Sequence, residues 1–248
     1  MSPKGSNVLP LAGVEVIVLA GGLGTRLRSV VGETPKILAP VDGVPFLDLL
    51  LNRLAELGAA RAILSLGYRA DMVLRHLEAN PPPLPVATAI ETEPLGTAGG
   101  VRLAAREATG GTVMVVNGDT WVEADYAALL ASHKRLGAPC SILCARVEDA
   151  RAYGTIEIDD RGIIARFLEK NAVQGGATVS AGVYLFAQAG LEALNAMPGP
   201  SLEQDFFAKF APGRAHGYIG ASVSFIDIGT PAGLALAASR LGRSAKGG

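Results

Sequence analysis

The chain has 248 residues and a formal net charge of −1, and 49% of its residues are apolar while 18% are charged. This composition supplies enough apolar surface for a folded core and excludes an intrinsically disordered chain. The charges nearly cancel and form no basic patch, which argues against nucleic acid as a partner. No apolar run is long enough to span a bilayer and the first residues lack a signal-peptide core, so we expect a cytoplasmic protein with no membrane partner.

Strand and helix patterns alternate through the first half of the chain. The expected strands are short apolar runs, and the expected helices carry apolar residues at three- and four-residue spacing. We expect strands over residues 14–19, 62–66, 86–90 and 112–116, and helices over residues 46–57, 71–78, 96–108 and 123–136. This alternation predicts an α/β fold with a single doubly wound, mostly parallel, Rossmann-like sheet and helices on both faces.

The second half is less regular. We expect strands over residues 141–147, 155–159, 163–168 and 179–186, and helices over residues 202–210 and 231–241. The turn sequence DDRG at residues 159–162 predicts a hairpin between the second and third of these strands. No linker separates two domains, so we expect one domain with a small β-rich insertion.

Cysteine and histidine indicate little chemistry. Cys140 and Cys144 lie in one apolar segment, where their spacing places both on the same face of a strand. A metal or redox site would need more ligands nearby, so we interpret them as small buried side chains. His76, His133 and His216 lie in separate segments, and we expect them at the surface or at helix ends.

A glycine-rich loop follows the first strand. Gly21, Gly22 and Gly24 allow backbone N–H groups to approach a ligand, because no Cβ atom stands in the way. Arg26 and Lys36 then add a forked cation and a compact one. Such a loop with two cations is typical of a site that holds a polyphosphate.

Two standard phosphate motifs do not fit this loop. The Walker A loop ends in GK[ST], whereas this loop ends in Thr25-Arg26-Leu27, which excludes a P-loop ATPase. The dinucleotide fingerprint needs a third glycine where Leu27 stands, which argues against an NAD site.

Two aspartates are candidates for a metal site. Asp119 follows the strand 112–116 in the sequence NGD, where it could cap the next helix or bind a metal. Asp227 stands among apolar residues in FIDIG, where a carboxylate is costly to bury unless it is paired or metal-bound. Two hard oxygen ligands suit Mg²⁺, which usually takes one or two carboxylates together with substrate phosphates.

Two further segments carry polar groups near predicted strand ends. The segment from Glu91 to Ala98 turns into a helix whose N-terminus favours an anion or a close ligand. Glu169 and Lys170 end another strand, and a solvated surface pair is the simplest interpretation of these two residues alone.

These segments occur in the order LAGGLGTRL, PK, EPLGTAG, NGD, YGT, EK, AGVY and FIDIG. That order and spacing resemble the sugar-1-phosphate nucleotidyltransferases, from about residue 14 to residue 241. The resemblance implies one domain, residues 1–248, with a nucleotide-binding half at about 14–137 and a sugar-binding half at about 138–241. It also implies that a nucleoside triphosphate and a sugar 1-phosphate react to give a nucleotide sugar and pyrophosphate.

The resemblance implies a role for each matched residue. Catalysis would use Arg26, Lys36, Asp119 and Asp227, and the two aspartates would hold Mg²⁺. The residues expected to bind the nucleotide are Leu19, Gly21, Gly22, Gly24, Thr25, Glu91, Gly96 and Thr97. The residues expected to bind the sugar phosphate are Asn117, Gly154, Glu169, Lys170 and Ser180.

The base is argued from Glu91, which stands where relatives that use uridine or thymidine triphosphates often have glutamine. A carboxylate only accepts hydrogen bonds, and guanine presents two adjacent donors, so we expect GTP if Glu91 rather than Glu93 faces the base. Within the family, the TRLRSVVG, EPLGT, SLEQDFF and FIDIGTP segments favour D-glycero-D-manno-heptose 1-phosphate as the sugar substrate.

Several alternatives stay open. Mannose 1-phosphate is the second choice of sugar. Ser180 stands where asparagine is frequent in the family, and this shorter side chain leaves the exact sugar open. A uridylyl or thymidylyl transfer to glucose 1-phosphate is another alternative within the class. A non-catalytic sugar-nucleotide-binding subunit is an alternative of another class, although none of the expected catalytic residues is lost. The sequence leaves both a monomer and a homo-oligomer open.

Overall fold

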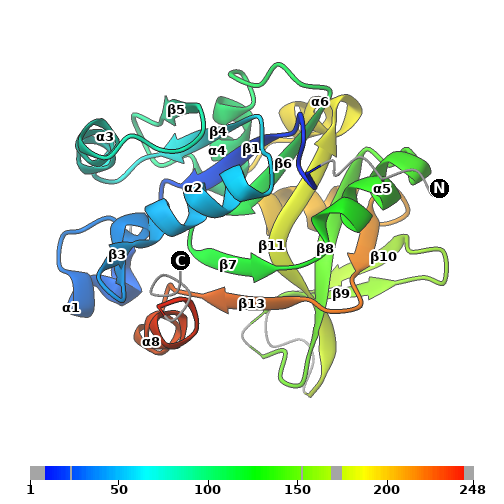
Figure 1. The fold of residues 1–248 in the computed structure, drawn as a ribbon. Helices are drawn as coiled ribbons and strands as arrows, with labels where there is room; N and C mark the ends of the chain where they lie inside the picture. Colours follow the sequence, from blue (N-terminus) through cyan, green and yellow to red (C-terminus); the bar gives the residue numbers. More distant parts are fainter. Residues whose placement is uncertain (1–8, 23, 152, 169–174, 243–248) are drawn as a thin grey trace, which may run out of the picture.

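The computed structural model describes residues 9–22, 24–151, 153–168 and 175–242 (Figure 1). Its central sheet has a parallel part made of β1 (Glu15–Ala20), β4 (Arg61–Leu66), β5 (Val86–Ile90) and β6 (Thr112–Asn117), in the order β6-β1-β4-β5. Within these described ranges no helix is both long and apolar enough to cross a membrane.

Antiparallel strands extend this sheet beyond β6. The long strand β11 (Ala177–Ala187) pairs antiparallel with β6, and β8 (Cys140–Val147) and β9 (Thr155–Ile158) pair with β11. β10 (Ile164–Leu168) forms the expected hairpin with β9, and β12 (His216–Ile219) pairs with β8. The predicted α/β class with a β-rich second half is confirmed.

The sheet is covered on both faces. In β1, Val16 and Val18 pack into one core cluster while Ile17 packs into the other, as the two-residue period of a strand requires. The first cluster takes the apolar sides of α2 (Phe46–Glu56), α3 (Ala70–Ala79) and α5 (Tyr126–Leu136). The second takes α4 (Gly96–Ala104), α6 (Gln188–Ala196), η3 (Leu202–Phe207) and α7 (Ala208–Phe210).

Short elements complete the fold around one edge of the sheet. Three helical turns, η1 (Thr25–Leu27), α1 (Arg28–Val31) and η2 (Lys36–Leu38), follow β1, and a small hairpin joins β2 (Pro40–Val41) to β3 (Val44–Pro45). A separate two-stranded sheet pairs β7 (Thr120–Glu123) with β13 (Ser224–Asp227), and α8 (Pro231–Leu241) follows β13 (Figure 1).

Several predicted elements need correction. The helix expected over 123–136 starts at Tyr126, because Asp125 accepts a hydrogen bond from Ala128 N–H at 2.9 Å as its N-cap and the preceding residues form β7. The helix expected over 96–108 ends at Ala104. The helix expected over 202–210 begins as a π-turn, η3, before it becomes α7. The sequence analysis missed β7, α6, β12 and β13, and it also missed the short elements α1, β2 and β3.

His76 and His133 lie in the last turns of α3 and α5, at helix ends as expected, whereas His216 lies in the strand β12. His133 and His216 are buried, and His133 Nδ1 lies 2.8 Å from Ser141 Oγ. Burial lowers the pKa of both rings, which therefore favours their neutral forms. Cys140 and Cys144 are buried and free, as predicted.

A buried carboxylate ties the start of β1 to its neighbours. Glu15 accepts hydrogen bonds from Thr109 N–H at 2.7 Å, from Gly110 N–H at 2.5 Å and from Arg61 Nε at 2.5 Å. Burial alone would raise the pKa of Glu15, but the hydrogen bonds from Gly110, Arg61 and Thr109 outweigh burial and lower it. The folded state therefore prefers the charged carboxylate.

We predict that Glu15→Gln lowers the free energy of unfolding by about 1–3 kcal/mol at pH 7, because two backbone donors and a guanidinium lose a charged acceptor. The lowered pKa stabilises the fold at pH values above the ordinary value of 4.5, and this stabilisation is lost as the pH falls through the folded-state pKa. Urea unfolding at pH 7 and at about pH 4 measures both effects. The exposed Glu78→Gln on α3 is the matched control, and equal stability of the two variants at pH 7 would contradict the assignment.

Candidate active site

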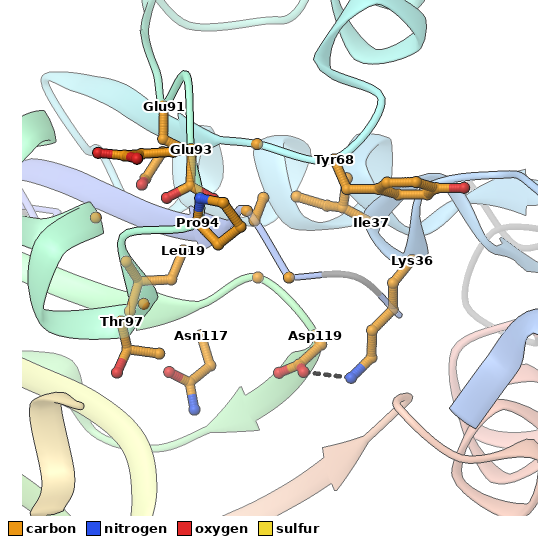
Figure 2. A pocket seen from close by; sticks show the side chains of 18 of the residues that line it. Leu19, Lys36, Ile37, Tyr68, Glu91, Glu93, Pro94, Thr97, Asn117 and Asp119 are labelled. Carbon is orange, nitrogen blue, oxygen red and sulfur yellow. Dashed lines mark hydrogen bonds and ion pairs between the residues drawn. The ribbon is translucent and has the colours of Figure 1, made fainter. Parts of the chain in front are cut away.

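A cavity of about 500 Å³ opens at the carboxyl ends of the four parallel strands (Figure 2). Residues at or just after the ends of β1, β4, β5 and β6 line this first cavity, together with Lys36 and Ile37 from η2. Doubly wound sheets bind their ligands at this position, beyond the carboxyl ends of the strands.

The backbone after β1 lies close to the carboxylate of Glu91. A Cβ atom on Gly21 would lie 2.8 Å from Glu91 Oε1, and one on Gly67 would collide with the same carboxylate. Leu95 N–H donates to Glu91 Oε2 at 3.0 Å, which fixes the orientation of the side chain. Glu91 and Asp119 lie at opposite ends of the first cavity (Figure 2).

The first turn of α4 contacts the segment before η3. Ala98 N–H donates to Pro200 O at 2.8 Å, and Leu202 N–H donates to Thr97 Oγ1 at 2.8 Å. A Cβ atom on Gly96 would collide with Pro200 O, so this glycine permits the close approach. The chain itself therefore satisfies part of the helix N-terminus that the sequence analysis assigned to a ligand.

A second cavity of about 600 Å³ lies beside the first. Its wall comes from the end of β6, from β11, from η3, and from β13 and α8. Thr97, Asn117 and Asp119 line both cavities, so these residues mark where the two meet. Two molecules bound in the two cavities would face each other across Asp119.

The small sheet of β7 and β13 brings the two candidate aspartates together. Thr120 and Asp227 are register partners in this antiparallel pair, and Ile228 N–H donates to Asp119 O at 2.9 Å. Thr120 Oγ1 donates to Asp119 Oδ1 at 3.0 Å, and Gly229 N–H donates to Asp227 Oδ1 at 2.6 Å. Residues more than one hundred positions apart are thus fixed side by side.

Lys36 lies between these two carboxylates. Its ammonium group forms an ion pair with Asp119 Oδ2 (Figure 2), and it lies 3.8 Å from Asp227 Oδ1. The Lys36 side chain is only 14% exposed, whereas each carboxylate is 34% exposed. A Cβ atom on Gly229 would collide with Lys36 Nζ, so the glycine leaves the space that the ammonium fills.

The same geometry tests whether a metal ion fits. Among the described residues no group of three or more His, Cys, Asp and Glu side chains could hold a metal ion. Asp119 and Asp227 nevertheless converge on one cation, the Lys36 ammonium, and their oxygens are the hard donors that Mg²⁺ prefers. A pair of carboxylates fits an ion that takes its remaining ligands from substrate phosphates and water.

Most of the predicted nucleotide residues line the first cavity. They are Leu19, Gly21, Gly22, Glu91, Gly96 and Thr97. Gly24 and Thr25 line neither cavity, because Gly24 instead supplies the positive φ of 59° that starts η1. Arg26 is exposed and lines the second cavity, not the first.

The predicted sugar-phosphate residues divide into two groups. Asn117, Gly154 and Ser180 line the second cavity together with Asp227. Glu169 and Lys170 lie outside the described residues. Their predicted roles therefore stay predictions.

The sequence analysis missed several cavity residues. Tyr68, just after β4, lines the first cavity, and the strand-end rule that selected Asp119 could have selected it too. Tyr153, Tyr184 and Glu203 also line the second cavity. They lie in the YGT, AGVY and SLEQDFF segments of the sequence analysis, which assigned no role to these side chains.

Two of these tyrosines are kept protonated. Burial, and then the charge of Asp227, raise the pKa of Tyr153. Burial, and then the charge of Glu203, raise the pKa of Tyr184 well above its ordinary range. Both phenols can therefore donate a hydrogen bond at neutral pH.

Comparison with known proteins gives consistent matches. The family model described as "Nucleotidyl transferase" matches residues 15–242. D-glycero-alpha-D-manno-heptose 1-phosphate guanylyltransferase from Aneurinibacillus thermoaerophilus is 36% identical over 88% of this chain and 94% of its own length. Mannose-1-phosphate guanylyltransferase from Mycobacterium tuberculosis is 34% identical over 88% of this chain, which spans 62% of that relative.

Solved structures show the same similarity. The crystal structure of HddC from Yersinia pseudotuberculosis complexed with GMP-PN has a TM-score of 0.79 and 34% identity, and the match covers 92% of this chain and 99% of that one. A second structure of HddC from the same organism has a TM-score of 0.80 and 35% identity.

Proposed function

The chain belongs to the nucleotidyl transferase family of enzymes, and from that premise we propose that it transfers GMP from GTP to D-glycero-D-manno-heptose 1-phosphate. The products are a GDP-sugar and pyrophosphate. The observation that carries this proposal is the junction of two cavities at Asp119, beside Lys36 and Asp227.

The first cavity fits the nucleotide. Glu91 and Asp119 lie at its opposite ends, so a base at Glu91 directs its phosphates toward Lys36 and Asp119 (Figure 2). The carboxylate of Glu91 offers two acceptor oxygens to the adjacent N1–H and N2–H₂ donors of guanine. The structure of the HddC neighbour is a complex with GMP-PN, which supports a guanine nucleotide as the substrate of this chain.

The second cavity fits the sugar 1-phosphate. One phosphate oxygen of the sugar forms a new bond to the α-phosphorus of GTP, while the bond from that phosphorus to the β-phosphate bridging oxygen breaks. Pyrophosphate leaves with the electron pair of the broken bond. Catalysis of such a transfer consists mainly of alignment and charge neutralisation.

The charged side chains divide this work. In our proposal, Lys36 leaves its position between the carboxylates and neutralises phosphate charge, and Arg26 approaches the phosphates from the side of the second cavity. Asp119 and Asp227, between which the Lys36 ammonium lies, would hold the metal ion. Enzymes of this family generally use a divalent ion; we assign it as Mg²⁺, which neutralises charge on the phosphate oxygens when bound.

The sugar is the less constrained half of the proposal. The relative that this chain spans almost completely is named for heptose 1-phosphate, which supports heptose as the first choice. Several other relatives are named for mannose 1-phosphate, and these keep mannose as the second candidate. Both sugars present several hydroxyl groups to the polar wall of the second cavity.

Pyrophosphate release over a grid of GTP, UTP, dTTP and ATP against the 1-phosphates of heptose, mannose and glucose tests the proposal. We expect the highest kcat/KM for GTP with the heptose substrate, and loss of turnover when a chelator is added. Release with no dependence on the sugar 1-phosphate would overturn it.

We predict that Asp119→Asn and Asp227→Asn each lower kcat by about 100-fold or more, because a neutral amide holds a divalent ion poorly at the point of charge development. Both amides keep the size of the side chain, so circular dichroism should show an intact fold. Near-normal turnover of both variants would remove the metal assignment.

We predict that Glu91→Gln reduces the preference for GTP over UTP by about tenfold or more, because the amide replaces one acceptor by a donor that opposes guanine. The ratio of kcat/KM for the two nucleotides measures the effect. Glu93→Gln, in the same turn, is the comparison. A change of preference in Glu93→Gln alone would assign the base contact to Glu93.

A further inference from the structure

The carboxylate of Glu203 lines the second cavity, and the proposed phosphoryl transfer gives it no role in binding phosphate or metal. Glu203 projects from η3 into the cavity wall and is partly buried. Asp119 and Asp227 surround the Lys36 ammonium, but Glu203 has no basic side chain as an ion-pair partner in the part of the chain that the structure describes.

The local backbone places Glu203 firmly. Ser201 caps η3 by accepting from Gln204 N–H at 3.0 Å, and Ser201 N–H donates to Asp205 Oδ2 at 2.9 Å. Leu202 N–H is bound to Thr97, a residue shared by both cavities. π-Turns are rare and occur frequently at functional sites. The position of Glu203 is thus set by the turn and by its contact with α4.

A short hydrogen-bond chain reaches Glu203 from β11. Ser180 Oγ–H donates to the Tyr184 hydroxyl, and that hydroxyl donates to Glu203 Oε1, each at 3.2 Å. Tyr184 is only 1% exposed and Ser180 lines the cavity, so the chain runs from the core to the cavity wall. One donor satisfies part of one carboxylate oxygen, which leaves acceptor capacity on a side chain that lines the cavity.

We propose that Glu203 is a specificity-determining residue that accepts hydrogen bonds from hydroxyl groups of the sugar, with Tyr184 as its positioning residue. This inference rests on the proposed function, and it names a sugar contact beyond the residues that the sequence analysis assigned to the sugar phosphate. A sugar supplies hydroxyl donors, and an ionised carboxylate is an acceptor only. A site that leaves such an acceptor unpaired discriminates strongly against a substrate that lacks the matching hydroxyl.

The experiment compares steady-state kinetics of the wild type, Glu203→Gln and Tyr184→Phe with pyrophosphate release as the readout. For Glu203→Gln we expect the KM for the sugar 1-phosphate to rise about tenfold or more, as for loss of a hydrogen bond to a charged group. The KM for GTP should stay within about twofold. Tyr184→Phe should raise the same sugar KM by a smaller factor. Glu192→Gln, an exposed residue on α6, should change neither KM.

Deoxy analogues of the sugar 1-phosphate distinguish a Glu203 that binds a sugar hydroxyl directly from a Glu203 that only maintains the structure of the cavity wall. For the analogue that lacks the hydroxyl bound by Glu203, the wild type should lose about tenfold in kcat/KM, and Glu203→Gln should lose no more than twofold. If Glu203→Gln does not fold, Glu203→Asp keeps the charge, withdraws it from the cavity, and should raise the sugar KM in the same way.

The contradicting results are specific. An unchanged sugar KM in a folded Glu203 variant would overturn the inference, and so would an equal rise in both KM values, which indicates a structural role. Failure of the proposed function is distinguishable, because then the wild type itself would show no pyrophosphate release that depends on a sugar 1-phosphate.

Discussion

The ammonium group of Lys36 between the carboxylates of Asp119 and Asp227 is the interaction on which the site depends. Two carboxylates held this close repel each other unless a cation lies between them. Each of the three charges comes from a different part of the chain, and each is fixed by backbone contacts of η2, β7 or β13. The Lys36 ammonium therefore lies beside Asp119, one of the residues at which the two cavities meet, and we place the proposed phosphoryl transfer there.

Close backbone approaches prepare this junction. A Cβ atom on Gly118 would lie 2.5 Å from Leu19 O, and one on Gly182 would lie 2.6 Å from Asn117 Nδ2. Gly182 also adopts a φ of 77°, which few other residues tolerate, at an irregularity in the pairing of β11 with β8. The absence of a Cβ atom at Gly118 and Gly182 thus allows β1, β6 and β11 to approach one another closely near Asp119. The high glycine content of the chain has a specific purpose at these positions.

Much of the fold could be predicted because its signals are local. The bounds of β5 and α8 are those that the sequence predicts, and β1, α2 and β6 differ from prediction by one residue at one or both ends. The strand β7 was missed because its four residues lie directly before a helix and follow the NGD turn. The pairing of β7 with β13 joins residues about one hundred positions apart, so no local pattern could predict it.

For the site, the structure shows which of the residues selected from the sequence lie together, while their roles stay predictions. Asp119, Asp227, Lys36 and Glu91 were selected from motifs, and the structure brings the first three together. Gly24 and Thr25 were assigned to the nucleotide together with the rest of the loop, but they start η1 and line neither cavity, so their assignment stays a prediction. Glu203 could be selected only from the structure, because its proposed role depends on a hydrogen bond with Tyr184 in the wall of the second cavity.

The most direct measurement of the central claim is ³¹P NMR of the protein with GTP, D-glycero-D-manno-heptose 1-phosphate and Mg²⁺. The account predicts equal amounts of a GDP-sugar and pyrophosphate, formed only when the sugar 1-phosphate is present. Hydrolysis of GTP that does not depend on any sugar 1-phosphate, or no reaction with any of them, would contradict it.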